Sequence, residues 1–98
     1  MLDKMKKIFE LQGKISQIKK ELQATTVEAT RSDGGIKIVM NGEQRVLSLD
    51  ISDALIVAQD KERLKKDLQD CINEAIKKAQ ELATQKAKEI TGLDIPGI

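Results

Sequence analysis

The feature that most constrains the fold is residues 36–51, which read IKIVMNGEQRVLSLDI. Apolar and polar residues alternate on both sides of Asn41-Gly42, a dipeptide typical of the type I′ turn that joins two antiparallel strands. With a two-residue loop at this dipeptide, the apolar residues of both strands share one face. The sequence therefore predicts a hairpin with one covered face. The expected pairs are Met40 with Glu43, Ile38 with Arg45, and Ile36 with Leu47, and the expected covered residues are Ile36, Ile38, Leu47 and Leu49.

A second turn dipeptide, Asp33-Gly34, precedes this hairpin and favours the same kind of turn. A two-residue loop there adds one more strand, and its apolar residues fall on the face already defined by Ile38. We therefore expect residues 25–52 to form a three-stranded antiparallel meander. The expected pairs in this second hairpin are Arg31 with Ile36, Ala29 with Ile38, and Val27 with Met40.

Helical periodicity flanks this sheet on both sides. Residues 1–23 carry apolar side chains at alternating steps of three and four, which is the a/d pattern of a helix that packs along a seam. A short helical turn is expected at residues 54–58. A long helix is expected at residues 60–91, with Asp60 as its N-cap and Gly92 as the residue that ends it. Residues 92–98 are expected to form an irregular tail. Together, the two helical segments and the meander predict a single α+β domain.

The two helices are too long for so small a sheet. At 1.5 Å per residue they span roughly 35 Å and 45 Å. We expect them to leave the sheet on one side and to pack antiparallel as an arm. A row of alanines at every fourth position of the last helix would let another helix approach closely, and its wide apolar band favours a homodimer. The residues expected in arm or dimer packing are Ile8, Leu11, Ile15, Ala75, Ala79 and Ala83.

The composition argues against an enzyme or a metalloprotein. The chain has no histidine and a single cysteine, Cys71, so neither a disulfide nor a zinc site with several cysteines is possible within one chain. The carboxylates alternate with lysines on the helices, as is typical of a solvated face. We expect no catalytic residue, no metal, no cofactor and no small-molecule substrate. Since no apolar run approaches membrane-spanning length and no signal-peptide core is present, the cytoplasm is the expected location.

The charges are unevenly distributed although the net charge is only +1. Residues 1–23 hold six lysines against three acidic residues, and residues 75–91 hold four lysines against two. These regions become neighbours in an antiparallel arm, where ammonium groups can contact DNA phosphates. Arginine, the preferred base-reading side chain, occurs only three times, so we expect contacts to the DNA backbone. The alternative is that the lysines only keep exposed helices soluble. The candidate DNA-binding residues are Lys4, Lys6, Lys7, Lys14, Lys19, Lys20, Lys77, Lys78, Lys86 and Lys88.

Taken together, these segments resemble the YbaB/EbfC family. The resemblance runs from the lysine- and glutamine-rich first helix through GIKIVMNGEQRVLSLDIS and DKERLKKDLQDCINEAIKKAQEL to GLDIPGI, and so covers nearly the whole chain. One departure is Asp50-Ile51-Ser52, where the family has Ile-Asp-Pro. The resemblance implies a helix–sheet–helix fold, a tweezer-like homodimer, DNA binding and association with the nucleoid. The remaining alternative is a structural module that binds another protein through its helical arms.

Overall fold

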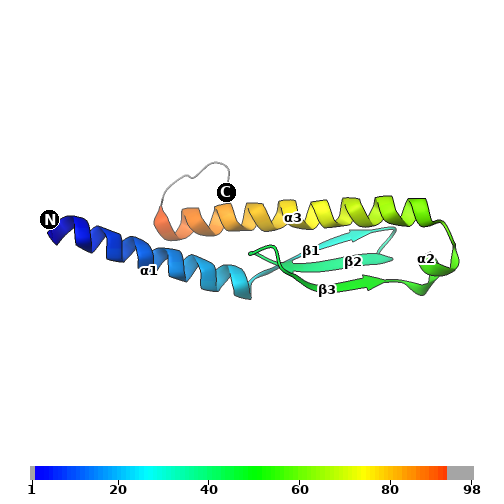
Figure 1. The fold of residues 1–98 in the computed structure, drawn as a ribbon, viewed down its shortest axis with the longest axis horizontal. Helices are drawn as coiled ribbons and strands as arrows, with labels where there is room; N and C mark the ends of the chain where they lie inside the picture. Colours follow the sequence, from blue (N-terminus) through cyan, green and yellow to red (C-terminus); the bar gives the residue numbers. More distant parts are fainter. Residues whose placement is uncertain (1, 93–98) are drawn as a thin grey trace.

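The computed structural model describes residues 2–92 and has the expected α+β architecture (Figure 1). One long helix precedes the sheet, and a second long helix follows it after a short one. Residues 93–98 of the expected tail lie outside the described residues. In chain order the elements are α1 (Leu2–Ala24), β1 (Thr26–Arg31), β2 (Ile36–Asn41), β3 (Val46–Ile51), α2 (Asp53–Val57) and α3 (Lys61–Thr91).

The sheet is antiparallel in the order β1-β2-β3, and the predicted β1–β2 register is confirmed. Ala29 pairs with Ile38, and the hairpin closes at Asp33-Gly34. Both turn residues have positive φ, at 54° and 87°, as a type I′ turn requires. The N–H of Gly35 donates to the carbonyl of Ser32 at 2.9 Å across these two residues. Ser32 also has a positive φ, of 57°, and the ladder ends with the pair of Arg31 and Ile36.

The predicted β2–β3 register is wrong. Ile38 pairs with Leu49 instead of Arg45, and Ile36 pairs with Ile51 instead of Leu47. For these two pairs the displacement is four residues, which leaves apolar side chains opposite Ile36 and Ile38 because the strand period is two. The third expected pair, Met40 with Glu43, is replaced by Met40 with Val46, because a bulge interrupts the ladder between Val39 and Met40.

The predicted register fails because Asn41 and Gly42 make hydrogen bonds that a tight turn does not contain. The side-chain oxygen of Asn41 accepts hydrogen bonds from the N–H groups of Glu43 and Arg45, both at 3.0 Å, and thereby shapes a longer loop. The N–H of Gly42 donates to the carbonyl of Leu22 at 2.8 Å, at the end of α1. Gln44, with φ of 63°, supplies the left-handed residue of the loop. The dipeptide thus joins the hairpin to a helix and does not form the tight turn.

The core lies between α3 and the first two strands. It comprises Ala29, Ile36, Ile38 and Met40 from the sheet and Cys71, Ala75 and Ala79 from α3. The helix contact expected at Ala75 and Ala79 is therefore a contact with the sheet, where small side chains let the helix lie close. The prediction that Leu47 and Leu49 are covered is wrong within the single chain, because α3 packs mainly on β1 and β2. Leu47 stays 52% and Leu49 49% exposed, whereas Ile36 and Ile38 are buried as expected.

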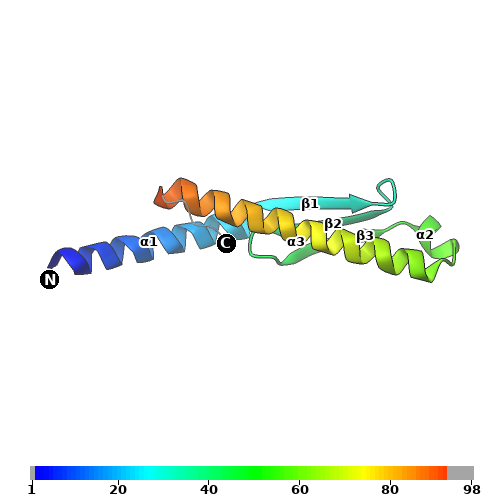
Figure 2. The same ribbon diagram turned by 90° about the horizontal axis from the view of Figure 1, so that it is seen from above.

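Beyond the sheet, α3 runs antiparallel beside α1, so the expected arm is present (Figures 1 and 2). Only the C-terminal part of α1 lies beside α3, and the N-terminal turns of α1 extend past the end of α3 in both views. The expected caps of α3 are confirmed. The side chain of Asp60 accepts from the N–H of Arg63, and Gly92 adopts a left-handed conformation with φ of 72°.

Cys71 is a free cysteine that packs as a small residue of the buried core. Its side chain is inaccessible to solvent, and its Sγ donates to the carbonyl of Ala29 at 3.3 Å. Burial raises the pKa of the Cys71 thiol, with a smaller opposing effect from the nearby Arg31 guanidinium. The thiol therefore remains protonated, and the neutral thiol is a poor nucleophile.

Two glycines are expected to respond to alanine in opposite ways. A Cβ at Gly42 would lie 3.0 Å from the Cβ of Leu22 and 3.1 Å from its Cα, so Gly42→Ala should cost about 1–3 kcal/mol of stability. A Cβ at Gly13 would meet nothing within 4 Å, so Gly13→Ala should add up to about 1 kcal/mol by helix propensity. Urea denaturation measures both changes, and a loss at Gly13 or a gain at Gly42 would contradict this packing.

Candidate nucleic-acid interface

The lysine-rich segments lie in the half of the molecule opposite α2, where the C-terminal part of α1 runs beside α3 and the N-terminal turns of α1 extend past its end. The six lysines of α1 are exposed, and the distal part of α3, which carries Lys86 and Lys88, runs next to α1 (Figure 1). Within α3, Lys77 and Lys88 line a shallow groove of about 400 Å³, with Gln80 and Gln85 between them. The structure thus brings the α1 lysines and the distal α3 lysines into one arm.

Two of the candidate lysines are engaged within the chain. The Nζ of Lys78 donates to the carbonyl of Glu28 at 2.8 Å, which places this side chain over β1 and away from the arm tip. The Nζ of Lys86 lies 3.7 Å from a carboxylate oxygen of Glu89, and its side chain is 26% exposed. These contacts reduce the availability of both ammonium groups for an external phosphate.

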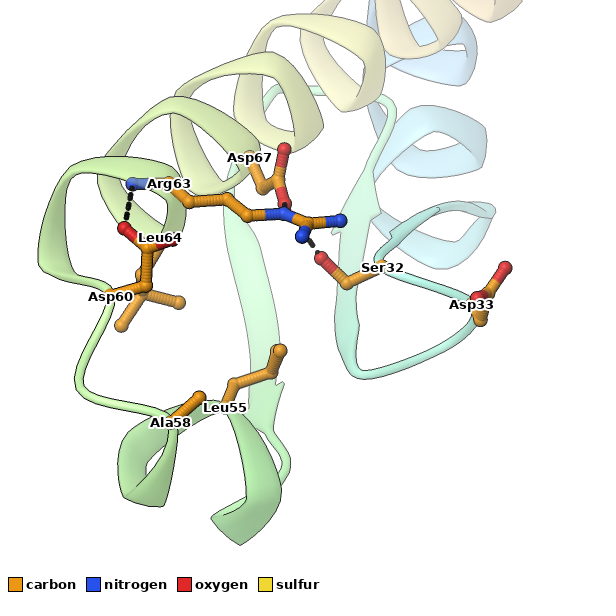
Figure 3. Close-up of a pocket in the computed structure, with 8 residues that line it drawn as sticks. All are labelled: Ser32, Asp33, Leu55, Ala58, Asp60, Arg63, Leu64 and Asp67. Atoms are coloured by element: carbon orange, nitrogen blue, oxygen red, sulfur yellow. Dashed lines mark hydrogen bonds and ion pairs between the residues drawn. The ribbon is translucent and has the colours of Figure 1, made fainter.

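Carboxylates gather in a pocket at the opposite end of the molecule. This pocket of about 370 Å³ lies between the β1–β2 turn, α2 and the start of α3 (Figure 3). Asp33, Asp60 and Asp67 contribute carboxylates to it, and Arg63 is the one basic residue among those that line it. Ser32 Oγ donates to Asp67 Oδ2 at 2.8 Å, and the same oxygen lies 3.8 Å from Arg63 Nε. Three carboxylates against one guanidinium make this pocket unfavourable for a phosphate. The contact between the β1–β2 turn and α3 has no signature in the sequence.

The residues expected in arm or dimer packing fall into two groups. Ala75 and Ala79 are buried within the chain, and Ala83 is half-buried. The α1 residues Ile8, Leu11 and Ile15 are 50–56% exposed in the single chain. Within residues 2–92, no group of three His, Cys, Asp or Glu side chains is arranged to hold a metal ion. None of the helices in the same residues is long and apolar enough to cross a membrane.

These features define a helix–sheet–helix protein with a basic arm at one end and an acidic pocket at the other. Residues 1–93 match the YbaB/EbfC DNA-binding family, and the chain belongs to this family. The resemblance suggested by its sequence segments is thereby confirmed.

Relatives of similar length carry a functional name. The chain is 35% identical over 95 residues to a nucleoid-associated protein of Pelotomaculum thermopropionicum, covering 96% of this chain and 90% of the relative. It is also 35% identical over 95 residues to a nucleoid-associated protein of Syntrophobacter fumaroxidans, covering 96% and 86%. Its fold is similar to the crystal structure of an uncharacterized protein from Helicobacter pylori, with a TM-score of 0.70, 27% identity, and coverage of 93% of this chain and 89% of the other.

Proposed function

We propose that this chain is a cytoplasmic, nucleoid-associated protein that binds duplex DNA and catalyses no reaction. The single observation that carries the proposal is the gathering of exposed lysines on an arm that lies away from the acidic pocket. Ammonium groups on an exposed arm can replace the counterions of a polyanion, which favours binding without regard to base sequence. The family of the chain and the names of its relatives support the same function.

The contacts are mainly to the DNA backbone in this proposal. Arg31 is held by Glu74 at 3.0 Å and also donates to the carbonyl of Thr30. Arg63 lies at the acidic pocket beside Asp67. Two of the three arginines are thus placed near the sheet and away from the arm, so lysines supply most of the cationic groups that can contact phosphates. Phosphate contacts position a protein on DNA but carry no sequence information directly.

The test of DNA binding is its dependence on salt. Binding to several unrelated duplexes is measured by gel shift at about 50 and about 200 mM salt, where a protein that neutralises several phosphates loses affinity steeply. We expect similar affinities for all duplexes and a clear loss at the higher salt concentration. Absence of binding to every duplex at low salt would instead favour a module that binds another protein through its arms.

A homodimer would cover the apolar surface that the single chain leaves open. The β3 surface, which we define as Val46, Leu47 and Leu49, is about half exposed because α3 packs mainly on β1 and β2. β3 is also the sheet edge on which α3 does not lie, so its outward backbone groups are open to a second strand. Together with the exposed apolar residues of α1, this surface supports association with a second copy.

The β3 surface yields a direct prediction about mass. Light scattering at micromolar concentration should give the mass of a dimer for the unchanged protein. Leu47→Glu should shift it toward the monomer, because two carboxylates would be buried at the interface. Val57→Glu serves as the matched control, since Val57 is 76% exposed on α2 and lies outside the β3 surface. A fully helical monomer for the unchanged protein, or equal effects of both substitutions, would contradict the proposed interface.

A further inference from the structure

The start of the β2–β3 loop holds the two groups that react when an asparagine loses its side-chain amide. The amide carbon is attacked by the backbone nitrogen of the next residue, and a glycine in that position leaves the approach unhindered because it has no side chain. Asn41-Gly42 is such a pair. The only other asparagine in the sequence, Asn73, is followed by Glu74 and lies within α3. Asn41 is therefore the residue at which this reaction is chemically most favoured.

The side-chain amide of Asn41 is held in place and polarised. Its Oδ1 accepts hydrogen bonds from the N–H groups of Glu43 and Arg45, both at 3.0 Å. Two backbone donors on one carbonyl oxygen stabilise the negative charge that develops there during attack on the carbonyl carbon, as in an oxyanion hole. Asn41 also borders an open hollow of about 760 Å³, so water can come close to the amide. These contacts do not by themselves prevent attack at Cγ.

The attacking nitrogen, in contrast, is held by the end of α1. The N–H of Gly42 donates to the carbonyl of Leu22 at 2.8 Å and to the carbonyl of Thr25 at 3.1 Å. Gly42 is buried, and Leu22 packs on it so closely that a Cβ at Gly42 would lie 2.6 Å from Leu22 Cδ2. The nitrogen can lose its proton and turn toward Asn41 only when α1 moves away from the loop.

We propose that Asn41-Gly42 is a site of spontaneous deamidation that becomes reactive only when α1 leaves the β2–β3 loop. The Gly42 nitrogen gives up its proton and forms a bond to Cγ of Asn41. The bond from Cγ to Nδ2 breaks, and Nδ2 leaves with that proton as ammonia. The product is a succinimide ring, which water opens at either carbonyl to give aspartate or isoaspartate. The reaction needs only this chain and water, so it is independent of DNA binding.

Either product hinders the return of α1 to the loop. Asn41 is only 5% exposed, so an aspartate in its place puts a negative charge where little water can reach it. Isoaspartate instead adds a methylene group to the main chain before Gly42, which displaces Gly42 from its contact with Leu22. A temporary release of α1 thereby becomes permanent.

The experiment follows the conversion by peptide mass spectrometry during incubation at mildly alkaline pH. We expect the urea-unfolded chain to react at Asn41. The folded protein should react more than about tenfold more slowly, because only the fraction of molecules with α1 released contributes. Leu22→Ala should raise the rate in the folded protein, since it removes the side chain that packs on Gly42. Asn73 should stay unmodified in every sample and serves as the internal reference.

Leu68→Ala is the matched control, because Leu68 is also a leucine packed against the core but lies on α3. It should lower stability in urea while leaving the rate at Asn41 in the folded protein near the parental value. Equal acceleration by both substitutions would show that the reaction follows global unfolding and would overturn the role of α1. A folded protein that reacts as fast as the unfolded chain, or a Leu22→Ala variant with the parental rate, would overturn it as well.

Discussion

Replacing Ala79 with leucine is expected to destabilise the fold by about 1–3 kcal/mol, the usual cost of forcing extra methylenes into a packed core. Ala79 is inaccessible to solvent and belongs to the core between α3 and the strands that carry Ile38 and Met40. The larger side chain can enter only if α3 moves away from the sheet. Urea denaturation should show a lower midpoint with an unchanged slope, which indicates a change of stability without a change of exposed surface.

The control for this prediction lies one residue further along the same helix. Gln80 is exposed, so Gln80→Leu should change stability by no more than about 0.5 kcal/mol. The loss at Ala79 should also be independent of protein concentration, because its contacts lie within one chain. A neutral result at Ala79 would place it on an open surface, and a loss that grows on dilution would assign it to the contact between two copies.

The sheet shows where local sequence signals suffice and where they do not. Asp33-Gly34 closes its hairpin as predicted because its loop is formed by local backbone bonds, such as that from Gly35 to Ser32. Asn41-Gly42 carries an equally strong turn signal, but the N–H of Gly42 is used by the carbonyl of Leu22. That hydrogen bond joins the β2–β3 loop to the end of α1, and these two segments are distant in the sequence. The turn preference of a dipeptide cannot predict such a contact.

In the helices, too, local features are predictable from the sequence, whereas contacts between distant segments are not. Their positions, the caps of α3 and the antiparallel arm follow from periodicity and from Asp60 and Gly92. The alanine row indicates close packing but does not specify the partner, so the sheet contact at Ala75 and Ala79 was not predicted. Charge counting places the lysines on the arm, yet it misses the bond from Lys78 to the carbonyl of Glu28, which depends on how α3 crosses β1.

The largest expected effect on function comes from removing the lysines of the arm. In a variant with Lys4, Lys6, Lys7, Lys86 and Lys88 all changed to glutamine, the removal of each phosphate-binding ammonium group should flatten the slope of log affinity against log salt by about 0.9. If all five lysines bind phosphates, the full set would flatten it by about 4–5 for each chain that contacts the DNA, and by about twice as much for a dimer in which both chains do. Lys86 should contribute least, because it pairs with Glu89 within the chain.

Lysines outside the arm provide the controls for this measurement. Lys61 and Lys65 lie at the start of α3, next to the acidic pocket, and Lys65 is 3.7 Å from Glu62. Their replacement by glutamine should leave the slope unchanged, and so should Lys78→Gln, because Lys78 Nζ is bound to the carbonyl of Glu28. If the five-lysine variant stays folded and dimeric but keeps the parental slope, the arm does not contact DNA. Equal losses from Lys61 and Lys65 would move the binding surface to the sheet end.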